Sequence, residues 1–100
     1  MVTKIQSLHF DADQRLVMLV EEKIEKLKHY FKADASAEVI LKMEKVGQVQ
    51  DKIVEIIYHI PGAKFVVTSI QKSFELALNE AYHNIKMQIL KYKEKAQKKH

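Results

Sequence analysis

The apolar residues of this chain change their spacing along the sequence, and that change limits the folds open to it. From residue 74 to residue 95 they recur every three or four positions, and no glycine or proline interrupts the run. From residue 37 to residue 46 they alternate with charged residues instead. The first spacing is typical of an amphipathic helix and the second of a half-buried strand. The chain therefore combines helices with a sheet.

The same two spacings divide the rest of the chain into elements. They predict strands over 2–8, 37–46, 52–60 and 63–70, and helices over 13–31 and 74–95. Asp11 or Asp13 is expected to cap the first helix and Ser73 the second. Residues 47–51 are expected to be a polar connection, and Pro61-Gly62 suits the centre of a type II turn. The order is β-α-β-β-β-α, which predicts an α+β fold with a four-stranded sheet and two helices packed on one face.

The helical crossover lets the first two strands run parallel, and the last three should form an antiparallel meander. The strand residues with charged neighbours must point at the helices. We expect this inward set to be Val39, Leu41, Met43, Val54, Ile56, Tyr58, Phe65 and Val67. The alternation then leaves five aliphatic residues on the outer face, namely Ile40, Ile53, Ile57, Val66 and Ile70. They are either scattered surface residues or a surface that binds a partner. One such partner would be a second copy of the chain, in a homodimer through Ile40, Ile57, Val66 and Ile70.

Composition and motifs argue against several classes of protein. The 100 residues include no cysteine, and no apolar run approaches the roughly 20 residues of a membrane span. We expect a cytoplasmic protein with a single domain over 1–95 and a flexible basic tail over 96–100. The five histidines lack the spacing of a metal motif, the two glycines are isolated, and no serine lies in a nucleophile motif. The sequence therefore predicts no catalytic residues, metal, cofactor or small-molecule substrate.

Positive charge is concentrated at the C-terminal end. Residues 84–100 hold six lysines and one glutamate, whereas the rest of the chain is nearly neutral. On the last helix Lys91 and Lys95 share one face and Lys86 and Lys93 share another, and on the first helix Lys23 and Lys26 face together. Helices lying side by side would join these six residues, the candidate RNA-binding set, into one positive strip. The alternative is a solvated helix end whose lysines favour the helix dipole.

Lysine binds phosphate as a point charge and reads no base. The chain has a single arginine, Arg15, so recognition of individual bases is poorly supported. A cationic strip of this kind suits a folded phosphate surface that is recognised by its shape, as RNA often is.

Three segments resemble a known family. The segments Val20–Phe31, Ile40–Lys45 and Met87–Lys95 are similar to the first helix, second strand and closing helix of the ribosome hibernation promoting factors. These proteins are also called ribosome-associated inhibitor A or sigma-54 modulation proteins, and the chain resembles their short form. The resemblance implies a fold like the double-stranded-RNA-binding domain. It also implies binding to the small ribosomal subunit, in the channel of messenger and transfer RNA, which blocks translation and favours ribosome hibernation.

The family's basic positions match at Lys23, Lys26, Lys91 and Lys95, which the resemblance implies are ribosomal-RNA contacts. The chain departs from the family at Met87, where arginine is usual, and at Asn84, where lysine is common. These departures and the apolar outer sheet face motivate an alternative hypothesis. In it the chain is a protein-interaction or homo-oligomerisation module that kept the fold and lost ribosome binding.

Overall fold

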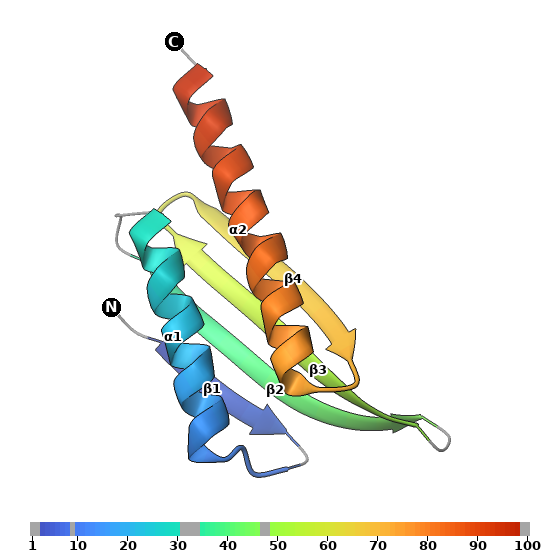
Figure 1. Cartoon of the computed structure of the whole chain (residues 1–100). Coiled ribbons are helices and arrows are strands. Elements are labelled where there is room, and N and C mark those ends of the chain that lie inside the picture. Colours follow the sequence, from blue (N-terminus) through green and yellow to red (C-terminus); the bar gives the residue numbers. More distant parts are fainter. Residues whose placement is uncertain (1–2, 9, 31–34, 47–48, 99–100) are drawn as a thin grey trace.

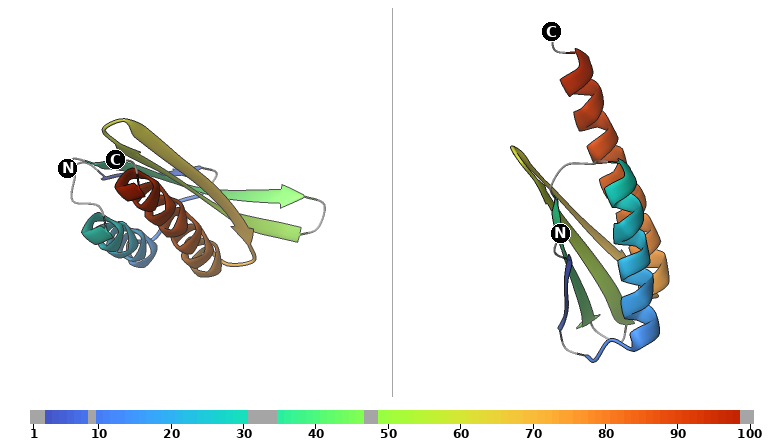
Figure 2. Two further views of the ribbon diagram at one scale, coloured as in Figure 1. Left: turned by 90° about the horizontal axis from the view of Figure 1, so that it is seen from above. Right: turned by 90° about the vertical axis from the view of Figure 1, so that its left-hand side faces the viewer.

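The computed structural model describes residues 3–8, 10–30, 35–46 and 49–98 and confirms the predicted order of elements. The strands are β1 (Thr3–Leu8), β2 (Ser36–Val46), β3 (Val49–Ile60) and β4 (Ala63–Gln71), and the helices are α1 (Gln14–Tyr30) and α2 (Phe74–Lys98). Figure 1 shows both helices in front of the sheet, and the turned views in Figure 2 show that they cover the same face. The predicted α+β architecture is therefore confirmed.

The strands lie in the order β1-β2-β3-β4. Strand β1 runs parallel to β2, and the other two pairs are antiparallel, as the connections predicted. The β2–β3 ladder continues to Val46↔Val49, although β1 pairs only as far as Lys42 and β4 only as far as Lys52. The two middle strands thus extend beyond the four-stranded part as a ribbon, visible at the lower right of Figure 1.

Two predicted boundaries are corrected by the structure. Residues 49–51, expected to be a polar connection, belong to β3, because antiparallel backbone pairing such as Glu44↔Asp51 needs no apolar side chains. Residues 47 and 48 of that connection lie outside the described residues. Helix α2 continues to Lys98 rather than ending at 95, since no helix-breaking residue intervenes. Residues 99 and 100 of the expected tail also lie outside the described part.

Local signals at the helix starts and at the β3–β4 turn act as predicted. The Asp13 carboxylate accepts a hydrogen bond from the Leu16 N–H at 2.8 Å, so Asp13 rather than Asp11 caps α1. The Ser73 hydroxyl accepts one from the Leu76 N–H at 3.1 Å and caps α2. Gly62 has a φ of 86°, the left-handed value that the third residue of a type II turn requires.

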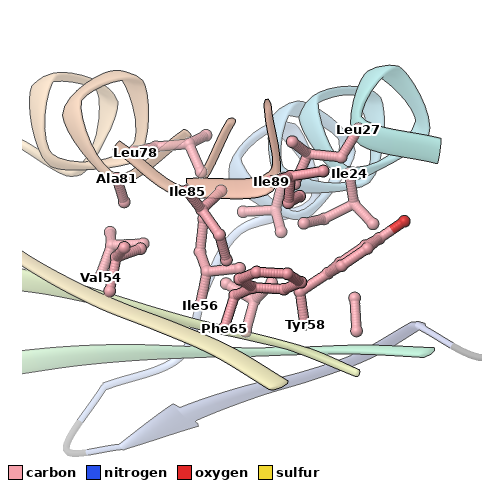
Figure 3. Packing of buried hydrophobic residues seen from close by; sticks show 14 of the residues in the cluster. Ile24, Leu27, Val54, Ile56, Tyr58, Phe65, Leu78, Ala81, Ile85 and Ile89 are labelled. Atoms are coloured by element: carbon pink, nitrogen blue, oxygen red, sulfur yellow. The ribbon is translucent and has the colours of Figure 1, made fainter. Parts of the chain in front are cut away.

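The core lies between the helices and the inner face of the sheet. Ile24 and Leu27 of α1 and Ile89 of α2 point at Tyr58 and its neighbours on the central strands (Figure 3). The inward set predicted from the alternation is buried, except for Met43, which is half-buried near the start of the ribbon. The buried surface of these apolar side chains is the main force that holds the helices on the sheet.

Two hydroxyls are buried in this core without a hydrogen-bond partner in the described structure, those of Tyr58 and Ser69. Burial disfavours a charged phenolate, so it raises the pKa of Tyr58 above its ordinary value. Ser69 is paired in register with Val54, which lies beneath Ala81 of α2 in Figure 3. Ser69 therefore lies under the same helix, where water has no access.

Candidate nucleic-acid interface

The two helices lie side by side and run in the same direction, from the lower end of Figure 1 to the upper end. At the lower end the rings of Phe10, just before α1, and Phe74, which begins α2, stack with their centroids 4.7 Å apart. Arg15 and Leu19 of α1 line one hollow there together with Glu75 of α2. These contacts set how far one helix is shifted along the other.

Farther up, an aromatic residue of α2 contacts a lysine of α1. The Nζ of Lys23 lies 5.0 Å from the centre of the Tyr82 ring, within the range of a cation–π interaction. Both side chains are half-buried, and the contact shows that the Tyr82 side of α2 faces α1. Sequence reasoning missed Tyr82, because this residue lies beside the apolar stripe of α2 rather than on it.

The contact between Lys23 and Tyr82 shows which sides of the two helices face each other, and so where the lysines of the next turns lie. One turn on from Lys23, the exposed Lys26 lies on the same side of α1. One turn on from Tyr82, the half-buried Lys86 lies on the side of α2 that faces α1, and Lys93 follows two turns later on that side. We call Lys23, Lys26, Lys86 and Lys93 the interhelical row. It joins lysines that are some 60 residues apart in the chain.

The remaining two predicted residues, Lys91 and Lys95, form an outward row. Lys91 comes two residues after the fully buried Ile89, so it points away from the sheet. Lys95 lies one turn further along, next to Tyr92, whose ring packs edge-on against Phe65 of β4. Both lysines are exposed. The six candidates thus occupy one layer of the molecule, but in two rows on nearly opposite sides of α2 rather than in a single strip.

Acidic side chains lie both among these rows and away from them: the exposed Glu94 lies between Lys93 and Lys95 on α2, and the exposed Glu22 lies four residues before Lys26 on α1. On α2, Glu75 and Glu80 lie in the first half of the helix, and Glu80 accepts a hydrogen bond from the Gln71 side chain at 3.2 Å. On α1, Glu25 forms an ion pair with Lys28 at 3.4 Å. Positive charge therefore gathers at the upper end of the helix layer, where it also favours the helix dipole. Figure 1 shows this end of α2 projecting beyond the sheet.

The two positions at which the chain departs from the family pattern lie on this same helix. Asn84 is exposed, and Met87 is 42% exposed. An uncharged side chain at each position leaves the lysines of α2 as the source of its positive charge.

The described residues show no centre for chemistry. Within them, no three histidine, aspartate or glutamate side chains gather as a metal ion would require. His29, His59 and His83 are exposed and lie on different elements. In the same part of the chain, no helix combines the length and apolarity needed to cross a lipid bilayer. The distinctive surface is the cationic helix layer, so fold and charge together define a small binding protein.

Comparison with known proteins identifies the family. Residues 3–97 match the profile of the family described as Sigma 54 modulation protein / S30EA ribosomal protein, and the chain belongs to this family. The resemblance seen in the sequence is thereby confirmed. The family is ribosome-associated and not enzymatic, which also confirms the prediction of a protein without catalytic activity.

Relatives and solved structures agree with this assignment. The chain is 30% identical to a ribosome hibernation promoting factor of Azotobacter vinelandii over 95 residues, which cover 95% of this chain and 85% of the relative. It is 29% identical to that of Pseudomonas putida over 97 residues, which cover 97% and 91%.

Two solved structures share the fold. The N-terminal domain of Thermus thermophilus protein Y matches with a TM-score of 0.78 at 20% identity, covering 89% of this chain and 94% of that domain. A ribosomal subunit interface protein from Coxiella burnetii matches with a TM-score of 0.81 at 18% identity, covering 93% and 98%.

Proposed function

We propose that this protein is a cytoplasmic ribosome hibernation factor that binds the small ribosomal subunit through the cationic helix layer. Bound in the channel that carries messenger and transfer RNA, it blocks translation and keeps idle ribosomes in store. The observation that carries the proposal is the alignment of Lys23 and Lys26 with Lys86 and Lys93 along neighbouring helices, in a chain of this family.

The arrangement suits a phosphate-lined RNA surface. Lysine ammonium groups in parallel rows neutralise backbone phosphates without selecting bases, so recognition depends on the shape of the RNA. The C-terminal end of α2 projects beyond the sheet (Figure 1), and Lys91, Lys93 and Lys95 precede its last residue, Lys98, so this end of the helix can reach into a groove or channel. The position of Tyr82 under Lys23 limits the freedom of that side chain and lowers the entropy lost on binding.

The proposal predicts a steep dependence of affinity on salt. Six lysine–phosphate contacts with RNA correspond to a log–log slope of about −4, using roughly 0.7 per contact. Affinity should therefore fall roughly 300-fold between 50 and 200 mM monovalent salt. Co-sedimentation of the purified protein with small subunits over this range measures the slope. Binding that is indifferent to salt would contradict a phosphate-based interface.

Charge reversal locates the interface. The variant Lys91→Glu/Lys95→Glu removes two contacts, which should reduce affinity at 100 mM salt by about 25-fold and make the slope shallower by about 1.4. The matched control is Lys4→Glu/Lys64→Glu, in which two exposed lysines of the strands, away from the helix layer, undergo the same charge change. The control should bind as the wild type does. An equal loss in both variants would show only a general effect of net charge.

A second assay tests where on the subunit the protein binds. Addition of the protein to a cell-free translation reaction should reduce synthesis, and small subunits preloaded with messenger RNA and initiator transfer RNA should bind it less. Small subunits that bind it equally in both states would place the site outside the channel.

A further inference from the structure

Among the residues that the structure describes, no helix or strand packs on the face of the sheet opposite the helices, as Figure 2 shows. Its pattern follows from the strand register. The central row across β1 to β4 is Gln6, Ile40, Glu55 and Thr68. The row two residues away on one side is Lys4, Glu38, Ile57 and Val66, and that on the other side is Leu8, Lys42, Ile53 and Ile70.

The five aliphatic residues that were predicted to point outward do lie on this face. Val66 is 43% exposed and Ile70 is 55% exposed, whereas Ile40, Ile53 and Ile57 are half-buried between their neighbours. The register pairs Ile57 with Val66 and Ile53 with Ile70 across β3 and β4. The two apolar pairs therefore lie at equal distances on either side of the central row.

The charges on this face follow the opposite rule. Glu38 and Lys42 lie on β2 at equal distances from Ile40, with opposite signs. Farther out, on β3, the exposed side chain of His59 lies at one end and the half-buried Asp51 at the other. On β1 a reversal of the sheet about its central row superimposes Lys4 on Leu8, but on β2, β3 and β4 it superimposes opposite charges on each other and apolar residues on apolar residues. Over these three strands the face is therefore complementary to itself.

We propose that a second copy of this chain docks on the face, with a two-fold axis that runs along the central row, perpendicular to the strands. Each protomer's Glu38 then faces the partner's Lys42, and its Ile57 faces the partner's Ile53. Its Val66 faces the partner's Ile70, and Ile40 meets its own symmetry copy. Because the interface is isologous, every such pair except the last occurs twice.

Two features make this dimer weak. The carboxylate of Glu55 accepts a hydrogen bond from the Thr68 hydroxyl at 3.3 Å and lies in the central row. It is therefore close to the Glu55 carboxylate of the partner, and the two like charges repel each other. Four strands and six residues give a footprint of roughly 20 by 20 Å, about half of the ~800 Å² per partner that standard interfaces bury. We therefore expect monomers at about 10 µM and dimers only on the order of 1 mM.

The ammonium group of Lys42 is available for this pairing. It lies 3.8 Å from the Glu44 carboxylate of its own strand, with both side chains partly exposed. A contact of that length between solvated groups contributes little and is easily exchanged.

Charge exchange tests the proposal by sedimentation velocity at both protein concentrations. Glu38→Lys alone and Lys42→Glu alone each place two like-charged pairs across the axis, so each should be monomeric at 1 mM. The double variant Glu38→Lys/Lys42→Glu restores opposite pairs and should dimerise again. Glu55→Gln removes the repulsion at the axis and should dimerise at a lower concentration than the wild type.

These residues lie on the surface, and circular dichroism verifies that each variant is folded. The helix-layer variant Lys91→Glu/Lys95→Glu is the control and should dimerise as the wild type does. A wild type that stays monomeric at 1 mM overturns the proposal. So do single variants that dimerise unchanged, or a double variant that does not recover. None of the exchanges should alter binding to small subunits, because the helix layer lies on the opposite side.

Discussion

Two serines four residues apart should respond in opposite ways to the same change. Ser69 of β4 is 2% exposed, and its hydroxyl has no hydrogen-bond partner in the described structure. Ser73 lies on the surface, and its hydroxyl accepts a hydrogen bond from the Leu76 N–H at 3.1 Å. We expect Ser69→Ala to raise the free energy of unfolding and Ser73→Ala to lower it.

The magnitudes follow from the two environments. A hydroxyl buried without a partner costs about 1–3 kcal/mol, and alanine at position 69 recovers the lower part of that range, about 1 kcal/mol, because it leaves a small void. Loss of a helix N-cap costs about 1 kcal/mol. For a chain of 100 residues the unfolding entropy near the midpoint is about 0.2 kcal/mol/K, so 1 kcal/mol corresponds to about 5 °C. The two variants should therefore melt about 10 °C apart.

Thermal and urea unfolding followed by circular dichroism measure both effects at neutral pH. The urea m-value should stay constant, which shows that the two variants differ in stability rather than in the surface exposed on unfolding. The double variant should return close to the wild type. If Ser69→Ala is destabilising by as much as Ser73→Ala, the Ser69 hydroxyl has a partner, and the account of this part of the core is wrong.

Three further changes test other parts of the structure by urea unfolding. Tyr58→Phe removes the second unpartnered hydroxyl and should stabilise by about 1 kcal/mol at neutral pH. Burial raises the pKa of Tyr58 above its ordinary value of 10.0. The stability of the wild type that depends on the neutral phenol is therefore complete below pH 10 and is lost as the pH rises towards the folded-state pKa. The stability advantage of Tyr58→Phe should accordingly grow above pH 10. Gly62→Ala should lower the free energy of unfolding by about 1 kcal/mol. The loss comes from the φ of 86° alone, because an added Cβ meets no atom within 4 Å, and Gly62→Asn should lose less. Phe10→Leu should lose about 1 kcal/mol with the Phe74 stack, and an unchanged stability would show that the stack contributes nothing.

Much of the fold was predictable because its signals are local. Alternation identified the inward face of every central strand, and helical spacing identified both helices. Single residues with one dominant role, such as Gly62 at a positive φ and Ser73 as a cap, acted as expected. The prediction failed at residues 49–51, where polar side chains suggested a loop. Backbone pairing between antiparallel strands continues there without help from burial, and side-chain pattern carries no signal of it.

The proposed binding surface was predictable only in part. Charge counting identified the lysines, and helical spacing divided those of α2 into two faces. It did not show which face lies next to α1, because that depends on how α2 is rotated on the sheet. The contact between Lys23 and Tyr82 decides this in favour of Lys86 and Lys93. The role of Tyr82 had no signal of its own, since a tyrosine beside an apolar stripe looks like an ordinary boundary residue.

The sequence by itself determined the type and order of the elements, the residues that face the core, the absence of recognisable catalytic motifs and the concentration of lysine at one end. Each of these depends on residue type and on spacing within a few turns of chain. Only the tertiary structure decided which lysines of the two helices come together, how far the β2–β3 ribbon extends, and which outer-face residues of β2 to β4 lie at equal distances from the central row. These depend on the rotation and shift of whole elements. Contacts between residues far apart in the chain, such as Phe10 with Phe74, set that placement, and local pattern carries no record of them.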